Sequence, residues 1–298
     1  MIFAILAIPM MYNTLSQTLN ANAQQADFNI ATAGDWGCND RTEGTVDDME
    51  GRSPELIIGL GDYSYADSVD CWLEIVVDPI DDKMQIAIGD HDDDRSSKLR
   101  DLMEHFDMSS QYYALSHENV RIIVMSTEVD YNAGSAQHSF VESELEDAAA
   151  DPSIDWIIVA VHKQAYASPS SGTHTYATLT NVYHPMFDEH GVDLVLQAHA
   201  HLFERSYPIK YNPDSPRNPI RTDAAREFYS DPEGVIYATV GTAGASPKPD
   251  FDGRRSYIED QYEGFGFLDI QIIDGGQTMR VRFYDDDGSA QDRFQITK

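Results

Sequence analysis

Residues 56–65 read LIIGLGDYSY, an uncharged apolar run that passes directly into a glycine, an aspartate and two tyrosines. A short apolar run bounded by glycine is typical of a buried β-strand. Four further apolar runs have the same character, at residues 30–33, 84–88, 154–161 and 192–197. Each of the five runs is followed by an aspartate or a histidine, so we expect these polar side chains to stand at strand ends.

Helical patterns alternate with several of these strands. Apolar residues recur at helical spacing over residues 95–106, 139–149 and 176–189, which favours βαβ units with right-handed crossovers. Further strands are expected at residues 112–115, 120–125, 235–240, 265–273, 278–284 and 293–297, with a hairpin turn at Gly275-Gly276 and a proline-containing loop at residues 207–218. We therefore predict an α/β fold, with residues 24–298 forming one domain in which two packed β-sheets have helices outside them.

The charge balance is strongly acidic. The chain of 298 residues has 51 Asp plus Glu against 20 Lys plus Arg, a formal net charge of -31. Such a surface repels nucleic-acid phosphates and anionic lipids, so no nucleic-acid binding is expected. The acidic residues are scattered, which favours a solvated shell suited to salty surroundings over an acidic docking patch. An anionic substrate would need a local positive centre, and metal ions can supply one.

The first residues have the pattern of an export signal. Residues 2–11 are apolar but too short to span a membrane, and Ala21 and Ala23 have the spacing of a signal-peptidase site. Residues 1–23 are predicted to be a signal peptide, with an uncleaved N-terminal anchor as the alternative, so the protein is expected outside the cytoplasm, secreted or tethered. The two cysteines, Cys38 and Cys71, either form a disulfide in that setting or remain free thiols.

The side chains at the strand ends are of types that bind metal ions. Six of them are Asp35, Asp62, Asp90, His162, His199 and His201. Taken singly, an aspartate after a glycine is more often a turn or helix-cap residue. Parallel strands, however, present their carboxyl ends along one edge of a sheet, so the whole set is expected to converge. Carboxylates and imidazoles suit iron, zinc or manganese, and ligands this numerous favour two ions that share a bridging carboxylate.

The order of the motifs resembles the calcineurin-like metallophosphoesterases and, within them, the purple acid phosphatases. The pattern of that family is Asp-x-Gly, Gly-Asp-x-x-Tyr, Gly-Asn-His-Asp/Glu, Val-x-x-His and Gly-His-x-His. The corresponding residues here are Asp35 and Gly37; Gly61, Asp62 and Tyr65; Asp90, His91 and Asp92; Val159 and His162; and His199 and His201. The similarity spans about residues 28–210. It implies a four-layer α/β/β/α sandwich of two packed mixed β-sheets flanked by helices.

The resemblance also implies a two-metal site. Ferric iron is expected at Asp35, Asp62, Tyr65 and His201, and a divalent iron, zinc or manganese ion at Asp62, Asp90, His162 and His199, with Asp62 as the bridge. The alternative for Tyr65 is a packed aromatic residue, because the chain has 16 tyrosines.

A second set of residues is expected to act on the substrate. His91 lies beside a predicted ligand rather than among the ligands, so it is a candidate general acid and phosphate contact, oriented by Asp92. The alternative for His91 is support of the ligands. His174, in a loop, is a candidate substrate-binding residue, as is Tyr166. No role in the site is expected for the remaining histidines, His105, His117, His138, His184 and His190.

Two positions depart from the family pattern. Asp90 stands where the pattern has Asn, and Ala198 stands where it has Gly. Asp90 would add a fourth anionic ligand and lower the attraction for phosphate by roughly one unit charge. Ala198 matters if its backbone needs a positive φ.

The expected function is metal-dependent hydrolysis of phosphate monoesters outside the cytoplasm, with a small phosphorylated substrate and release of inorganic phosphate. A phosphodiesterase or nucleotidase of the same fold is the alternative, because it would share every ligand. A further alternative is a non-catalytic relative that binds metal or phosphate.

Overall fold

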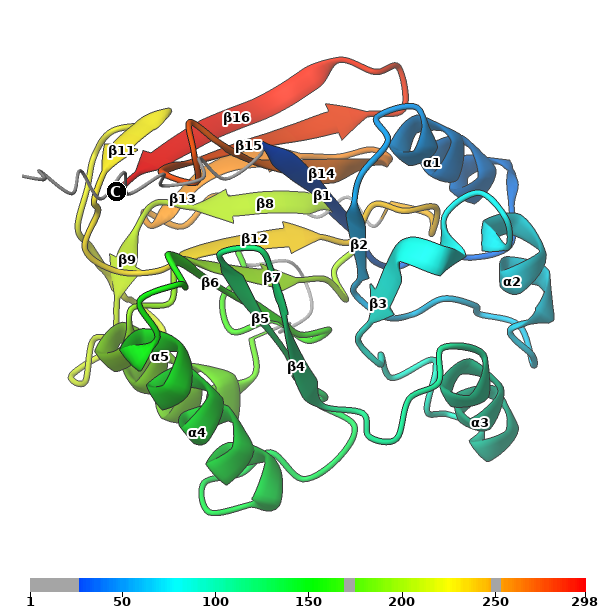
Figure 1. The fold of residues 1–298 in the computed structure, drawn as a ribbon, viewed down its shortest axis with the longest axis horizontal. Helices are drawn as coiled ribbons and strands as arrows, with labels where there is room; N and C mark the ends of the chain where they lie inside the picture. The colour runs from blue at the N-terminus through cyan, green and yellow to red at the C-terminus, as the bar shows by residue number, and fades with distance from the viewer. Residues whose placement is uncertain (1–26, 169–174, 248–252) are drawn as a thin grey trace, which may run out of the picture.

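One seven-stranded β-sheet carries the first three of the predicted strands. The computed structural model describes residues 27–168, 175–247 and 253–298 (Figure 1). In this first sheet the strand order is β11-β16-β15-β14-β1-β2-β3. The bounds are β1 Phe28–Ala33, β2 Leu56–Gly59, β3 Met84–Ile86, β11 Phe228–Ser230, β14 Gly266–Ile273, β15 Thr278–Asp285 and β16 Ala290–Thr297. Strands β1, β2 and β3 are parallel, whereas β14, β15 and β16 form an antiparallel meander.

A second seven-stranded sheet carries the two strands that precede the predicted histidine ligands. Its order is β13-β8-β12-β7-β6-β5-β4. The bounds are β4 Tyr113–His117, β5 Val120–Val124, β6 Trp156–Ala160, β7 Leu194–Gln197, β8 Phe203–Ser206, β12 Ile236–Val240 and β13 Ile258–Tyr262. Strands β5, β6, β7 and β12 are parallel and the other three are antiparallel to their neighbours, so this sheet is also mixed. A small ribbon joins β9 Ile209–Lys210 to β10 Ile220–Arg221.

The two sheets pack against each other through a buried apolar layer. Side chains of the first sheet, such as Ile30 and Ile58, belong to the same buried cluster as Ile158 and Leu196 of the second. The rings of Phe203 and Phe283 stack with their centroids 4.2 Å apart, and they come from β8 and β15 respectively. Apolar residues at alternate strand positions therefore form one continuous core between the sheets.

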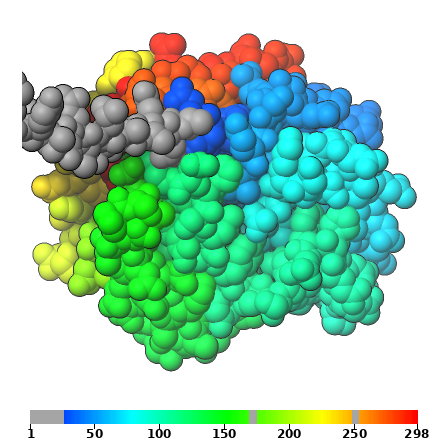
Figure 2. Space-filling model, viewed as in Figure 1, coloured from blue at the N-terminus to red at the C-terminus, as the bar shows by residue number. Residues whose placement is uncertain are grey.

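Helices cover both outer sides of this pair of sheets. Their bounds are α1 Asp40–Glu50, α2 Asp70–Val76, a short 3-10 turn Asp81–Lys83, α3 Ser96–His105, α4 Ala136–Ala150, a π-helical turn Leu179–Tyr183 and α5 His184–His190. Figure 1 shows α1 and α2 beside β1–β3, and α4 and α5 against the second sheet. In the space-filling view the blue and cyan residues around α1 and α2 occupy one side and the green residues of α4 the other (Figure 2). The four-layer prediction is confirmed.

Several elements differ from the sequence prediction. Helices α1 and α2 and strands β8, β11 and β13 were not predicted, and the expected loop at residues 207–218 contains β9. The helix predicted over residues 176–189 is split between the π-helical turn and α5. The predicted signal peptide, residues 1–23, lies outside the described residues. Within the described part of the chain, none of the helices has the length and apolar character needed to cross a bilayer.

The two cysteines form a disulfide. Cys38 follows β1 and Cys71 lies in the first turn of α2, with their Cα atoms 5.6 Å apart. This resolves the two alternatives that the sequence left open. The bond ties the segment after Asp35 to the segment after Tyr65. Asp35 and Tyr65 are both predicted ligands.

Candidate metal centre

The predicted ligands lie at the carboxyl ends of strands from both sheets. Asp35, Asp62 and Asp90 follow β1, β2 and β3, while His162 and His199 follow β6 and β7. All of them were expected along one sheet edge, but the structure divides them between two sheets whose edges meet. The junction is direct, because the N–H of Gly34 donates to the carbonyl of Val240 on β12 over 2.8 Å.

One group consists of Asp62, Asp90, His162 and His199, whose potential ligand atoms all lie within 4.8 Å of one another. His162 Nε2 lies 3.2 Å from Asp90 Oδ1 and 3.4 Å from Asp62 Oδ1. His199 Nδ1 lies 3.0 Å from the same Asp90 oxygen. Two carboxylates and two imidazoles facing one point are a donor set suited to a divalent transition metal.

A second group forms around the hydroxyl of Tyr65. This hydroxyl lies 3.2 Å from Asp35 Oδ1 and 3.1 Å from His201 Nε2. His201 Nε2 is in turn 3.4 Å from Asp35 Oδ1. Although Tyr65 as a residue is 39% exposed, its oxygen points inward among these groups. A packed aromatic residue would not need its hydroxyl in this position.

Asp62 belongs to both groups. Its Oδ1 faces His162, and its Oδ2 lies 3.5 Å from the hydroxyl of Tyr65. A carboxylate whose two oxygens point at two neighbouring donor sets has the placement required of a bridging ligand.

The backbone at these positions is held in an unusual conformation. Asp35, Asp62 and His199 have φ values of 56°, 57° and 69°, which are uncommon for residues other than glycine. Such conformations cluster at functional sites, where the surrounding structure enforces them. Ala198 is not among the described residues with positive φ, so the left-handed residue in that motif is His199 and an alanine fits where the family pattern has glycine.

Glycines allow the strand ends to approach the ligands closely. A Cβ atom added at Gly89 would lie 2.3 Å from Asp62 Oδ1, and one added at Gly241 would lie 2.4 Å from Asp35 Oδ2. Both are far below ordinary contact distances, so any side chain there would displace a predicted ligand. Gly241 belongs to a glycine-containing segment, residues 241–244, that lies beyond the five motifs.

Hydrogen bonds on the outer side fix the orientation of each imidazole. His162 Nδ1 lies 2.7 Å from the carbonyl of Leu60, and His201 Nδ1 lies 2.9 Å from the carbonyl of Ser246. A carbonyl only accepts, so both Nδ1 atoms carry the proton and both Nε2 atoms are left to face the carboxylates. His199 has the opposite orientation: its Nδ1 faces the group, and its Nε2 lies 3.0 Å from the hydroxyl of Tyr176.

The electrostatics of the two groups fit metal ions. Burial opposes a charge on His162, but the carboxylates of Asp62 and Asp90 outweigh it and hold the pKa of His162 well above its usual value. Burial, followed by the carboxylates of Asp35 and Asp62, raises the pKa of Tyr65. Asp35 Oδ2 is buried without a hydrogen-bond partner among the described residues. Bound cations would take the place of these protons and satisfy the bare oxygens.

His91 lies at the rim of the two groups. Its main-chain N–H donates to Asp62 Oδ1 over 2.9 Å, and the centroid of its ring is 4.7 Å from that of the Tyr65 ring. Its main-chain carbonyl accepts from the ammonium of Lys98 over 2.6 Å. The imidazole is therefore fixed through its backbone while its ring remains outside the ligand set.

Asp92 is fully buried and makes contacts other than the expected one with His91. Its Oδ2 accepts the N–H groups of Asp62 and Gly89 over 2.7 and 2.9 Å, and its Oδ1 accepts the N–H of Tyr63 over 2.9 Å. Both oxygens are thus occupied by the backbone of the loops after β2 and β3. These contacts favour a role in holding the two loops together.

The two candidate substrate residues have different outcomes. His174 lies outside the described residues, so its prediction stays as it was. Tyr166 is buried, and its hydroxyl lies 2.6 Å from His184 Nδ1, so its oxygen is taken up within the core.

Sequence reasoning missed three residues around the ligands. Lys98 is fully buried on α3, and its ammonium donates to the carbonyls of Ser64 and His91 over 2.9 and 2.6 Å. Tyr176 supports His199, and Lys163 lies 4.0 Å from Asp90 Oδ1. A lysine on a helix normally indicates solvent exposure, so no sequence signal marked Lys98. Lys163 carried a positional signal, because it directly follows the predicted ligand His162.

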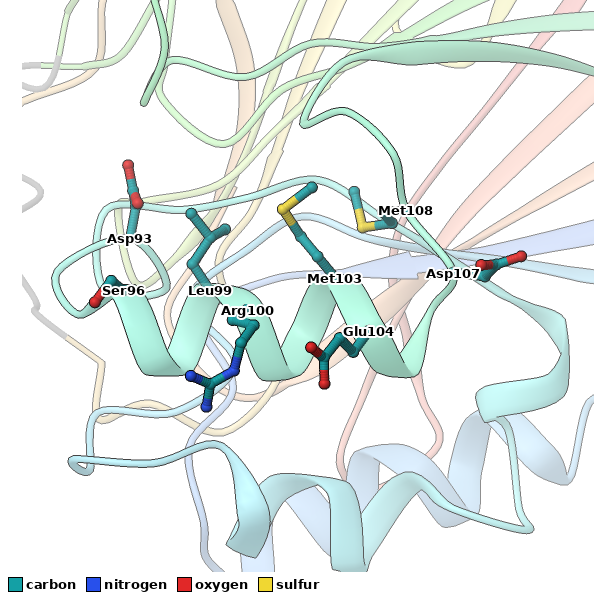
Figure 3. Close-up of a pocket in the computed structure, with 8 residues that line it drawn as sticks. All are labelled: Asp93, Ser96, Leu99, Arg100, Met103, Glu104, Asp107 and Met108. Atoms are coloured by element: carbon teal, nitrogen blue, oxygen red, sulfur yellow. The ribbon is translucent and has the colours of Figure 1, made fainter.

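Two of the hollows in the described part of the chain differ in the residues that line them. A hollow of about 620 Å³ runs along α3, where Leu99, Met103 and Met108 point to the same side (Figure 3). None of the seven predicted ligands lines it. A smaller hollow of about 390 Å³ is lined by Tyr65 and His201 together with Trp36, and it opens directly on the second group. The smaller hollow therefore gives access to the second group.

Comparison with known proteins gives consistent results. A family model described as calcineurin-like phosphoesterase matches residues 28–203. Purple acid phosphatase 23 of Arabidopsis thaliana is 23% identical over 291 residues, covering 83% of this chain and 59% of the plant protein. The Fe(3+)-Zn(2+) purple acid phosphatase 12 of the same plant is 29% identical over 179 residues, covering 55% of this chain and 35% of that protein.

A solved structure shows the same fold. Purple acid phosphatase PPD1 from yellow lupin (Lupinus luteus) superposes with a TM-score of 0.82 at 19% identity, over 92% of this chain and 54% of the lupin chain. The chain thus spans about half the length of the lupin protein, and between 22% and 61% of the length of curated relatives that it matches. The family model, the plant relatives and the lupin structure all agree with the resemblance that the five motifs indicated.

Proposed function

Because the chain belongs to the calcineurin-like phosphoesterase family, we propose that it hydrolyses phosphate monoesters at a two-metal centre and releases inorganic phosphate outside the cytoplasm. One observation carries this proposal: Asp62 directs one carboxylate oxygen at the His162 group and the other at the Tyr65 group. That placement is the one that a ligand bridging two ions requires.

The chain offers seven side chains to hold two ions. Asp35, Tyr65 and His201 would hold one, Asp90, His162 and His199 would hold the other, and Asp62 would bridge them. When bound, such a pair supplies positive charge for the phosphoryl group and a water molecule of lowered pKa. The hydroxyl of Tyr65 must lose its proton to bind, and this requires a strongly acidic cation because its pKa is raised in the metal-free protein. Ferric iron is the cation that best meets this requirement.

His91 is the candidate general acid. Its imidazole stands beside Tyr65 and outside the ligand set, where it can give a proton to the leaving alkoxide. The backbone of His91 is fixed on one side by Asp62 and on the other by Lys98, so the ring is placed without being used as a ligand.

The disulfide supports a location outside the cytoplasm. Structural disulfides persist in oxidising compartments and are rare in the reducing cytosol. Cys38 and Cys71 form one next to the predicted ligands, and the apolar segment at residues 2–11 has the pattern of an export signal. Two independent features of the chain thus favour export.

The test combines metal analysis with two assays. The purified protein is expected to contain two metal ions per chain and to absorb visible light through a tyrosinate-to-iron charge-transfer band. Tyr65→Phe should lose that band while His91→Ala keeps it and loses turnover of a chromogenic phosphate monoester. A monoester and a diester are assayed side by side.

Each alternative has its own result. Turnover of the diester alone would identify a phosphodiesterase. Bound metal without turnover of either ester would identify a binding protein. A protein that takes up no stoichiometric metal after supplementation would contradict the two-metal centre itself.

A further inference from the structure

Lys163 lies beside the ligand that departs from the family pattern. Its ammonium is 4.0 Å from Asp90 Oδ1 and 2.8 Å from Glu128 Oε1. Among the described residues, Lys163 is the one lysine or arginine whose charged group lies within 4 Å of a predicted ligand carboxylate. The chain therefore places a positive charge next to the position where Asp90 adds a negative one.

The surroundings hold this ammonium in place. The side chain of Lys163 is only 15% exposed and that of Glu128 only 12%. Glu128 Oε1 also accepts from the hydroxyl of Thr127 over 2.7 Å, which fixes the carboxylate, and the ring of Tyr176 lies 5.5 Å from the ammonium. Burying a long charged side chain is costly; the ion pair with Glu128 offsets that cost, and the ammonium has donors left for a second role.

The charges around Asp90 suggest that role. With Asp35, Asp62, a deprotonated Tyr65 and Asp90, four anionic ligands would face two cations, one more than the family pattern has. The added carboxylate weakens the attraction of the centre for an anionic phosphoryl group. The ammonium of Lys163, 4.0 Å from Asp90 Oδ1, adds a positive charge beside that carboxylate, and its ion pair with Glu128 offsets part of that charge.

We propose that Lys163 offsets the charge of Asp90 and contributes to binding the phosphate group of the substrate. This inference rests on the proposed function, since it assigns Lys163 a role at the same site. An ammonium has three N–H donors, and Glu128 takes one of them, so donors remain for phosphate oxygens. Lysine binds phosphate as a point charge, without the bidentate geometry that arginine would require.

The alternative is that Lys163 serves only as the ion-pair partner of Glu128. The two interpretations differ in how removal of the Lys163 charge changes two affinities, that for phosphate and that for the divalent ion. A positive charge next to Asp90 repels a divalent cation and attracts phosphate. Its removal should therefore weaken phosphate binding while leaving the binding of the divalent ion unchanged or tighter. Loss of a purely structural ion pair would loosen the site and weaken both.

The experiment measures both constants on the full protein. Zinc affinity is measured by titration in metal-buffered solution, and affinity of the metal-loaded protein for inorganic phosphate is measured by calorimetry, without turnover. For Lys163→Met we expect phosphate binding to weaken about tenfold and zinc binding to stay equal or tighten. Lys163→Arg, the matched control, keeps the charge and should bind phosphate more tightly than Lys163→Met.

Glu128→Gln serves as the opposite control. It removes a negative charge at the same place while its amide oxygen can still accept from Lys163, so phosphate binding should be equal or tighter. Thermal unfolding of each variant checks that it is folded, and Lys163→Gln replaces Lys163→Met if the apolar side chain is not tolerated.

The outcomes separate this inference from the proposed function. Weaker phosphate binding with retained zinc binding in Lys163→Met supports the inference. Unchanged phosphate binding, or parallel weakening of both, overturns the inference while leaving the two-metal centre in place. A wild-type protein that binds no metal overturns the proposed function and the inference with it.

Discussion

Asp92 shows how a residue within a recognised motif can make contacts other than the expected one. Its carboxylate accepts three backbone N–H groups, from Asp62, Tyr63 and Gly89. Burial, followed by the charge of Asp62, raises the pKa of Asp92 to about 7, and above that pH each hydrogen bond to the ionised carboxylate contributes about 1.5–3 kcal/mol. We infer that Asp92 keeps the loops after β2 and β3 at a fixed separation, so that the carboxylates of Asp62 and Asp90 can face the same ion.

We predict that Asp92→Asn destabilises these loops. One side of the new amide presents N–H donors to N–H donors, so at least one buried hydrogen bond is lost and the free energy of unfolding should fall by about 2–4 kcal/mol. Zinc affinity should fall with it. Denaturant unfolding and metal titration check both effects. Asp93→Asn is the control, because the Asp93 side chain has no hydrogen bond to the described residues. A variant of wild-type stability that loses only kcat would instead support the orienting role for His91.

Much of the ligand set could be predicted at this scale. Six of the seven predicted ligands follow from strand ends, because position along the chain is enough to place a side chain at the end of a strand, whereas Tyr65 follows from the resemblance to the family. The partners of those ligands could not be predicted. Lys98 reaches two carbonyls that are contributed by residues 7 and 34 positions away, and the sequence contains no sign of that encounter.

At the scale of elements, the missed segments lack an apolar signal. Helix α1 buries Thr42, Thr45, Val46 and Met49, so half of its inner face is threonine. Asn39 caps it by accepting the N–H groups of Arg41 and Thr42. Helix α2 has only seven residues, too few for a helical period to be recognised. Packing against the first sheet, rather than local propensity, specifies both helices.

Strand β8 was missed for a related reason, since it buries two charged residues. Arg205 pairs with Asp292 on β16 over 2.5 Å and with Glu259 on β13 over 2.6 Å. Glu204 accepts the N–H of Ser168 and the side-chain amide of Gln261. Adjacent charged residues such as Glu204 and Arg205 are usually exposed, and only the partners on distant strands make their burial possible.

Glu204 should make stability depend on pH. Burial raises its pKa above the usual value, although Gln261 and Ser168 oppose the shift. The folded protein then holds a proton that the unfolded chain has already released, so its contribution is complete below the unfolded pKa and declines as the pH rises through the folded pKa. The free energy of unfolding of Glu204→Gln relative to wild type should therefore increase with pH across that window, by about 1.4 kcal/mol for each unit of pKa shift. Chemical denaturation from acidic to neutral pH measures this difference, and a constant difference would contradict it.

The disulfide offers a second test at the scale of elements. It closes a loop of 33 residues that contains Asp62 and Tyr65. Chain-entropy arguments give about 4 kcal/mol for a loop of that length. The double variant Cys38→Ser, Cys71→Ser should lose stability of this order and bind metal more weakly. A reducing agent should destabilise the wild type and leave the double variant unaffected. Equal stability of the two proteins would show that α1 and α2 are held by packing alone.

For the whole molecule, the defining feature is a candidate metal centre placed between two sheets inside a strongly acidic chain. The first sheet contributes the carboxylates and the second contributes the histidines, so neither sheet alone could form the site. The core that joins them is therefore also what positions the ligands. Sequence periodicity predicted both sheets, but it could not predict that their edges meet at the link from Gly34 to Val240.

The net charge of -31 should make the stability of the metal-free protein rise with salt. Like charges on the folded surface lie closer together than in the unfolded chain, so their repulsion favours unfolding. Raising the ionic strength from about 0.1 M to 1 M shortens the screening length from about 10 Å to about 3 Å and weakens this repulsion. Each 1 kcal/mol gained should raise Tm by about 2–4 °C.

Thermal unfolding in potassium chloride with a chelator present measures the effect, and sucrose of matched osmolality separates screening from exclusion of solute. If Tm is flat or falls with potassium chloride, the acidic residues are already arranged so that they do not oppose folding, and an acidic docking surface becomes the better reading of the composition.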